Sequence, residues 1–157
     1  MSIEAKLTEL GIELPPPPPA VAAYEPWMRI GNLVFTSGQL PWRDGEMAYS
    51  GRCGEEITED QGYQAARQCA INAIAQIKAA AGDLDRVKCI VKVDGYVHTA
   101  PGFRGHPQVL NGASELFNAV FGERGRHARL AIGVDEMPLN AAVQICVTAE
   151  IEDYPIS

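Results

Sequence analysis

HARLAIGVDEMPLNAAVQICVTAEIE, residues 127–152, is the stretch whose pattern decides the fold. Apolar and polar side chains alternate in two runs on either side of the connection 137–140, which is the pattern of two strands that each bury one face. In the first run Arg129 shares a face with Ala131 and Gly133, so there is room beside its guanidinium for a molecule that is not protein. We therefore expect a small polar pocket with Arg129 at its floor.

The length and composition of the chain indicate a single globular domain. Its 157 residues are enough to bury roughly two thirds of the unfolded surface. Contents of 46% hydrophobic and 21% charged residues are ordinary for a soluble protein. No apolar run approaches the roughly 18 to 20 residues that a membrane span needs, and the first ten residues lack the apolar segment of an export signal. We therefore expect a cytoplasmic protein with no membrane partner.

The charged residues, histidines and cysteines argue against several kinds of site. Thirteen Lys and Arg against twenty Asp and Glu give a net charge of −7, which would repel a phosphate backbone, so no nucleic acid partner is expected. The three histidines have no metal-ligand spacing, so we expect neither a metal nor another cofactor. The cysteines are too far apart for a zinc or disulfide framework: Cys53, Cys69, Cys89 and Cys146.

Hydrophobic periodicity and turn residues predict the other elements. Thr58, followed by Gln61, has the capping-box spacing that begins a helix. Prolines 15–19 predict an extended arm that spaces a short N-terminal helix from the body, so we divide the chain into an arm, 1–19, and a domain, 20–157. In chain order we expect a helix at 3–10, a hairpin at 28–30 and 33–36, a short strand at 46–49, a helix at 58–81, a strand at 86–99 and a helix at 108–121.

This order of elements predicts an α+β fold in which two helices cover one face of a mixed sheet. The other face would be too polar for a deep core, yet it would lack the Lys and Glu density of a free surface. A homo-oligomer whose sheets face each other would bury such a face and form pockets at the subunit boundaries. The residues expected on it are Arg129, Ala131, Gly133, Cys146, Thr148 and Tyr96.

Four segments carry a resemblance to a known family. They are IGNLVFTSGQLP (30–41), the helix 58–81 with its continuation AAAGDLDRVKCIVKVDGYV (79–97), PQVLNGASELFNAVFG (107–122) and GRHARLAIGVDEMPLN (125–140). Together they resemble the YjgF/RidA family, the reactive intermediate deaminases formerly labelled endoribonuclease L-PSP, in its chorismate-mutase-like branch. The resemblance covers nearly the whole chain from Tyr24 to Glu152.

The resemblance implies a homotrimer with the sheets inward, the helices outward and a cleft between each pair of subunits. At the position of Arg129 the family has an arginine that holds the carboxylate of the substrate, which suits the bidentate geometry of a guanidinium. Tyr24 and Asn111 match the family's cleft tyrosine and helix asparagine, and the backbone at Gly38 lines the same cleft. Active members hydrolyse 2-enamines and 2-imines to 2-oxo acids and ammonia.

One departure from the family lies in the last strand, where V-E-I-E is common and this chain has Val143-Gln144-Ile145-Cys146. Cys146 stands where the second glutamate would bind and orient water. A thiol with an ordinary pKa of about 8.5 is a poor substitute for a carboxylate in that task. Positioning of the substrate alone could still assist the hydrolysis of an imine.

Structural roles stay open for three of these residues. Arg129 could form a salt bridge with Asp135 or Glu136 of a neighbouring subunit. Asn111 could cap or pack its helix, and Cys146 could be a small packed residue without a chemical role.

The sequence thus favours a hydrolase, a deaminase of small imines and enamines that carry a carboxylate. Arg129 would hold the carboxylate, and the substrate would also touch Tyr24, Gly38, Asn111 and the residues Ala131 and Cys146. The alternative is a non-catalytic module of the same fold that binds or senses a small carboxylic acid. Chorismate mutase activity would rest on fold analogy alone, and the acidic balance makes ribonuclease action the least favoured.

Overall fold

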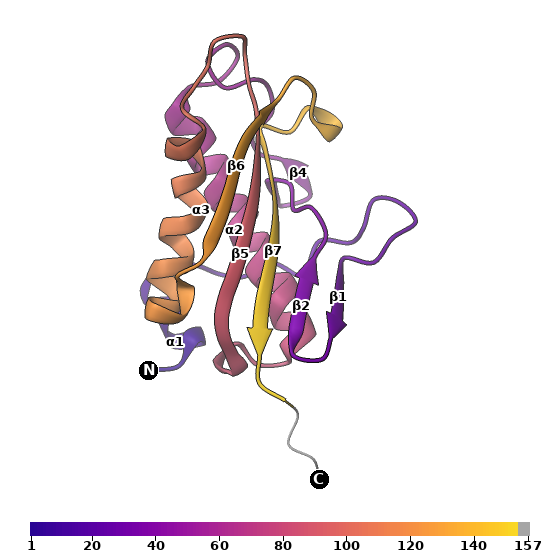
Figure 1. Cartoon of the computed structure of the whole chain (residues 1–157), viewed down its shortest axis with the longest axis vertical. Coiled ribbons are helices and arrows are strands. Elements are labelled where there is room, and N and C mark those ends of the chain that lie inside the picture. The colour runs from indigo at the N-terminus through magenta and orange to yellow at the C-terminus, as the bar shows by residue number, and fades with distance from the viewer. Residues whose placement is uncertain (154–157) are drawn as a thin grey trace.

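The computed structural model describes residues 1–153, so the last four residues of the predicted domain lie outside the described part. Its centre is a five-stranded mixed sheet (Figure 1), in which β6 (Ala128–Val134) runs parallel to β5 (Val87–His98) and the other neighbours are antiparallel. A separate two-stranded ribbon consists of β3 (Trp42–Arg43) and β4 (Glu46–Met47). Across the sheet the strands are β1 (Trp27–Ile30), β2 (Leu33–Thr36), β7 (Val143–Ile151), β5 (Val87–His98) and β6 (Ala128–Val134).

The two runs of the stretch 127–152 form β6 and β7, as predicted, but these strands do not pair with each other. Strand β5 lies between them, so that Val93 pairs with Arg129 on one side and with Val147 on the other. A short 3₁₀ turn, Pro138–Asn140, makes the connection, and Leu139 in it has a positive φ of 57°. Strands that are consecutive in sequence are therefore separated in the sheet by a strand from earlier in the chain.

The two long helices lie on one side of the sheet, which confirms the predicted α+β class (Figure 1). Helix α2 (Glu59–Ala81) begins with the predicted capping box: the Thr58 hydroxyl accepts from Gln61 N at 3.1 Å, and Gln61 Oε1 accepts from Thr58 N at 2.9 Å. Helix α3 (His106–Phe121) begins two residues before the predicted start, because Pro107 has the fixed φ that suits a first helical turn.

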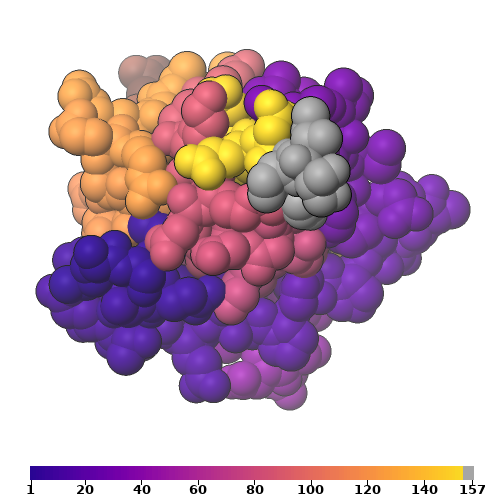
Figure 2. All heavy atoms as spheres, turned by 90° about the horizontal axis from the view of Figure 1, so that it is seen from below, coloured from indigo at the N-terminus to yellow at the C-terminus, as the bar shows by residue number. Residues whose placement is uncertain are grey.

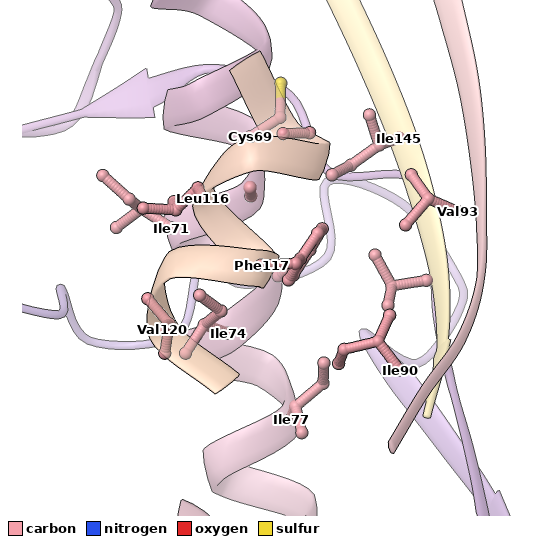
Figure 3. Packing of buried hydrophobic residues seen from close by; sticks show 14 of the residues in the cluster. Cys69, Ile71, Ile74, Ile77, Ile90, Val93, Leu116, Phe117, Val120 and Ile145 are labelled. Atoms are coloured by element: carbon pink, nitrogen blue, oxygen red, sulfur yellow. The ribbon is translucent and has the colours of Figure 1, made fainter. Parts of the chain in front are cut away.

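The core fills the space between these helices and the sheet. Gly112 of α3 has no Cβ, and the backbone carbonyl of Tyr63 in α2 occupies the place where one would lie, so the two helices can approach closely. The Phe117 side chain is completely buried. Figure 3 shows its ring between α3 and the strands that carry Val93 and Ile145.

The N-terminal helix α1 (Ile3–Glu9) packs on the body of the protein. Ile3 and Leu7 are buried in the main core, and Ile3 N donates to the Asp85 carboxylate at 2.7 Å. Figure 2 shows the N-terminal residues, in indigo, against the rest of the molecule. The expectation that the prolines space this helix from the body is therefore wrong, because its apolar face is buried with the others. The division into an arm, 1–19, and a domain stays a prediction.

The face of the sheet away from the helices is uncovered in the single chain. The predicted orientation of β6 relative to this face is wrong. Arg129 lies opposite the fully buried Val93, whereas Leu130 lies opposite Asp94. Since paired residues share a face, Arg129, Ala131 and Gly133 face α3. The expectation that these three lie on the open face is wrong. Its exposed apolar side chains are Met28, Ile30, Leu33, Phe35, Leu130 and Ile132.

Replacement of Phe117 by Ala should lower the free energy of unfolding by about 3–5 kcal/mol, because the buried ring leaves a cavity between α3 and the sheet. Urea or guanidinium unfolding measures the change. Val21→Ala is the control, because Val21 is 64% exposed and its loss should change stability by less than about 0.5 kcal/mol. Equal effects of the two substitutions would contradict the described core.

Candidate functional site

Arg129 of β6 is held by helix α3. Its Nη1 donates to Asn111 Oδ1 at 2.9 Å and to Ser114 Oγ at 3.2 Å, and its Nη2 donates to the Pro107 carbonyl at 3.5 Å. Asn111 and Ser114 are three positions apart, so both reach the strand from one side of the helix. The structure thus brings together Arg129 and Asn111, two residues that the sequence assigned to one cleft.

The partners of Arg129 are uncharged. Within residues 1–153, no carboxylate forms an ion pair with this guanidinium. The side chain is half-buried at the edge strand of the sheet. A partly desolvated cation with neutral ligands attracts an anion strongly. The alternative of a salt bridge to Asp135 or Glu136 concerns a neighbouring subunit and stays open.

The space beside Arg129 is smaller than the sequence indicates. A Cβ at Gly133 would meet His106 Nε2 and would lie 2.9 Å from Thr99 Oγ1, so His106 fills the volume that this glycine leaves. Ala131 is half-buried and packs against the main core. The expected room at Gly133 is therefore occupied, and a ligand of Arg129 would approach from the outer side of the edge strand.

Two residues of this cluster were missed from the sequence. Ser114 Oγ lies 2.8 Å from His127 Nε2, and His127 Nδ1 lies 2.7 Å from the Gly125 carbonyl oxygen. The edge of the His127 ring also packs on Phe117, with 5.9 Å between the ring centroids. Their spacing in the sequence could have indicated that they lie near the predicted site. Ser114 is three residues after Asn111 on the helix, and His127 is two residues before Arg129 of β6.

Tyr24 and Gly38 form a second cluster, toward the β1 and β2 edge of the sheet. Tyr24 is 47% exposed, and both residues line a small cavity beside the end of the proline arm. A Cβ at Gly38 would collide with Gln144 Oε1, so the glycine is required where this segment crosses β7. Gln144, a third residue that was not predicted to lie in the cleft, therefore lies against Gly38.

Cys146 belongs to neither cluster. It lies on the open face of β7, opposite Asp94 of β5, whereas Arg129 projects from the helix-covered face. Burial raises the pKa of the Cys146 thiol, and the negative charge of Asp94 raises it further. The neutral thiol therefore predominates at neutral pH, which argues against a nucleophile. Within one chain, Cys146 and Arg129 cannot hold the same small molecule.

Apart from Cys146, the expected cleft residues thus lie in two half-sites at different edges of one chain. Arg129, Asn111 and Ala131 lie at the β6 edge, and Tyr24 and Gly38 lie toward the β1 and β2 edge. Figure 1 shows β5 and β7 between these edges. A cleft that contains both half-sites therefore needs a second copy of the chain.

A larger groove, of ≈ 810 Å³, runs along the proline arm and contains none of the predicted site residues. Its amides serve the fold, because Gln68 and Asn72 both donate to the Trp42 carbonyl, at 3.0 and 2.9 Å. Among residues 1–153, no three His, Cys, Asp or Glu side chains are grouped as a metal site would require. In the same part of the chain, no helix has the length and hydropathy to cross a membrane.

Comparisons with known proteins agree on one family. The model of a family described as "YjgF/chorismate mutase-like, putative endoribonuclease" matches residues 4–151. Protein TCP17 of Trypanosoma cruzi is 41% identical over 152 residues, which are 96% of this chain and 95% of that protein.

Two solved structures illustrate the likeness. A Shewanella oneidensis MR-1 protein with the same endoribonuclease description is 38% identical, with a TM-score of 0.94 over 96% of this chain and 100% of that one. RidA from the Antarctic bacterium Psychrobacter sp. PAMC 21119 is 28% identical, with a TM-score of 0.61 over 87% of this chain and 94% of that one.

Alkylation of Cys146 should begin only at a higher pH than alkylation of free cysteine. Only the thiolate reacts, and burial and Asp94 raise the pKa of this thiol, so less thiolate exists at any given pH. The rate of iodoacetamide labelling against pH, followed by peptide mass spectrometry, measures this. Asp94→Asn should move the curve to lower pH. A wild-type curve at or below that of free cysteine would contradict the described environment.

Proposed function

Because the chain belongs to the YjgF/chorismate-mutase-like family, we propose that it is a reactive intermediate deaminase. Its substrates would be small 2-enamines and 2-imines that carry a carboxylate, and its products 2-oxo acids and ammonia. The observation that supports this most is the guanidinium of Arg129, which α3 holds through neutral acceptors. The similarity to a RidA protein supports the same assignment.

Arg129 would bind the substrate carboxylate and place the neighbouring imine carbon. Water then adds to this carbon, the C=N electron pair moves to nitrogen, and a proton from the water follows it. Collapse of the resulting carbinolamine releases ammonia and leaves the 2-oxo acid. Spontaneous imine hydrolysis is already easy, so fixed orientation can account for much of the acceleration.

The complete cleft would form between two copies in a homotrimer. Arg129 and Asn111 of one copy would face Tyr24 and the Gly38 backbone of the next. The separation of these half-sites within one chain supports this arrangement. The six exposed apolar side chains of the open sheet face support it as well, because such a patch marks an interaction surface.

A second function, a non-catalytic module that binds or senses a small carboxylic acid, is favoured by Cys146. This residue is a neutral thiol on the face opposite Arg129, so it supplies no base beside the guanidinium. Gln144, which lies against Gly38, is an uncharged amide and cannot take up a proton from water. The Arg129 cluster would then bind the carboxylate without turnover.

The enzyme should accelerate release of ammonia and 2-oxo acid from imines that an amino-acid oxidase generates in the assay. Arg129→Ala should lower kcat/KM by about 10- to 100-fold, because a charge-assisted hydrogen bond to the carboxylate is lost. Arg126→Ala is the matched control, since this arginine is 74% exposed and pairs with Glu123 at the surface.

Unchanged turnover in Arg129→Ala would refute the role of this arginine. Absence of acceleration in the wild-type protein, together with carboxylate binding that Arg129→Ala abolishes, would replace the deaminase with the binding module.

The chain should be a trimer in solution, and Ile132→Glu should shift it toward monomers. Ile132 is 42% exposed on the open face of the edge strand, and a carboxylate buried there without a partner is costly. Light scattering after size exclusion measures the mass. Val21→Glu, at a residue that is 64% exposed just after the arm, should leave the trimer intact. A monomeric wild-type protein would overturn the proposed assembly.

A further inference from the structure

A series of hydrogen bonds joins Gly125, His127, Ser114 and Arg129. The Gly125 carbonyl determines which atom donates and which accepts in each of them. The Gly125 oxygen can only accept, and it lies 2.7 Å from His127 Nδ1, so Nδ1 carries a hydrogen. In the neutral ring Nε2 is then an acceptor. Ser114 Oγ, 2.8 Å away, therefore donates its hydrogen to His127. The hydroxyl oxygen is left with only its lone pairs for other partners.

Through one of these lone pairs, the Ser114 oxygen accepts a hydrogen bond from Arg129. Ser114 Oγ and Asn111 Oδ1 lie 3.2 and 2.9 Å from Nη1, and together they use both hydrogens of that nitrogen. Of the five guanidinium hydrogens, the long 3.5 Å contact to the Pro107 carbonyl takes one from Nη2. Within residues 1–153, no protein acceptor takes the hydrogen of Nε.

We propose that Ser114 and His127 are positioning residues that make Arg129 present its Nε and Nη2 edge to the ligand. Two parallel hydrogens along this edge match the two oxygens of one planar carboxylate. The Nη1 side is already occupied, so a second acidic group would find no donor there. The site thereby selects monocarboxylates over dicarboxylates. This inference rests on the proposed carboxylate role of Arg129 but not on any catalytic step.

His127 acts on Arg129 only through Ser114. Without the imidazole, the Ser114 hydroxyl is free to rotate and to donate to the carbonyl one turn earlier in α3, as serines within helices do. The oxygen then moves away from Nη1, and the guanidinium can turn about its last bonds. Loss of either residue should therefore weaken carboxylate binding by a similar factor.

Titration of the full-length protein with pyruvate tests the proposal. The ¹H–¹⁵N resonance of Arg129 Nε should shift on binding, and the dissociation constant should rise about 3- to 10-fold in Ser114→Ala and in His127→Ala. The double variant should bind no more weakly than either single variant, because the two residues act in series. His127→Gln retains a neutral acceptor and should restore part of the affinity. Arg126→Ala should bind as the wild-type protein does.

Selection is tested with malonate, a dicarboxylate. It should bind more weakly than pyruvate to the wild-type protein, and Ser114→Ala should narrow this difference because Nη1 is released. Thermal unfolding of every variant distinguishes loss of positioning from loss of folding.

Three outcomes would overturn the proposal: additive losses in the double variant, an Nε resonance that pyruvate does not move, or affinities that the substitutions leave unchanged. Pyruvate binding with the expected pattern, in a protein that shows no turnover, would refute the deaminase and leave the positioning role standing. No pyruvate binding by the wild-type protein would refute the positioning role, and turnover of imines by the same protein would leave the deaminase standing.

Discussion

The parallel pairing of β6 with β5 is the constraint on which the candidate site depends. Its register places Arg129 opposite the buried Val93, so the arginine must project toward α3. A shift of one residue would turn Leu130 and Ile132 toward the helix and Arg129 toward the open face. Apolar burial along β5 fixes this register, and the position of the functional cation follows from it.

Helix α3 converts this orientation into a defined electrostatic environment. Neutral oxygens of Asn111, Ser114 and Pro107 hold the guanidinium and leave its charge uncompensated by the described part of the chain. In a protein with a net charge of −7, this edge is a local exception that can attract a small anion. Packing of α3 on α2 at Gly112, which tolerates no side chain, therefore contributes indirectly to the site.

The sequence predicted most elements because their signals are local. The Thr58 capping box, the alternation in residues 143–151 and the turn at Gly31 each depend on a few neighbouring residues. The orientation of β6 was not predictable in this way. Its two faces are both largely apolar apart from one arginine, so alternation alone does not say which of them meets a helix. Ser114 and His127 were missed because their roles arise from a contact between a helix and a strand.

By itself the sequence determined the α+β class, the positions of the long helices and strands, and the family. Capping residues, hydrophobic periodicity and motif spacing are local features that can be read from neighbouring residues. Only the tertiary structure decided that β5 separates β6 from β7 and that Arg129 and Cys146 lie on opposite faces. It also decided that the predicted cleft residues, apart from Cys146, fall into two half-sites. The reason is physical: strand order and facing depend on long-range burial against the helices, which no short segment encodes.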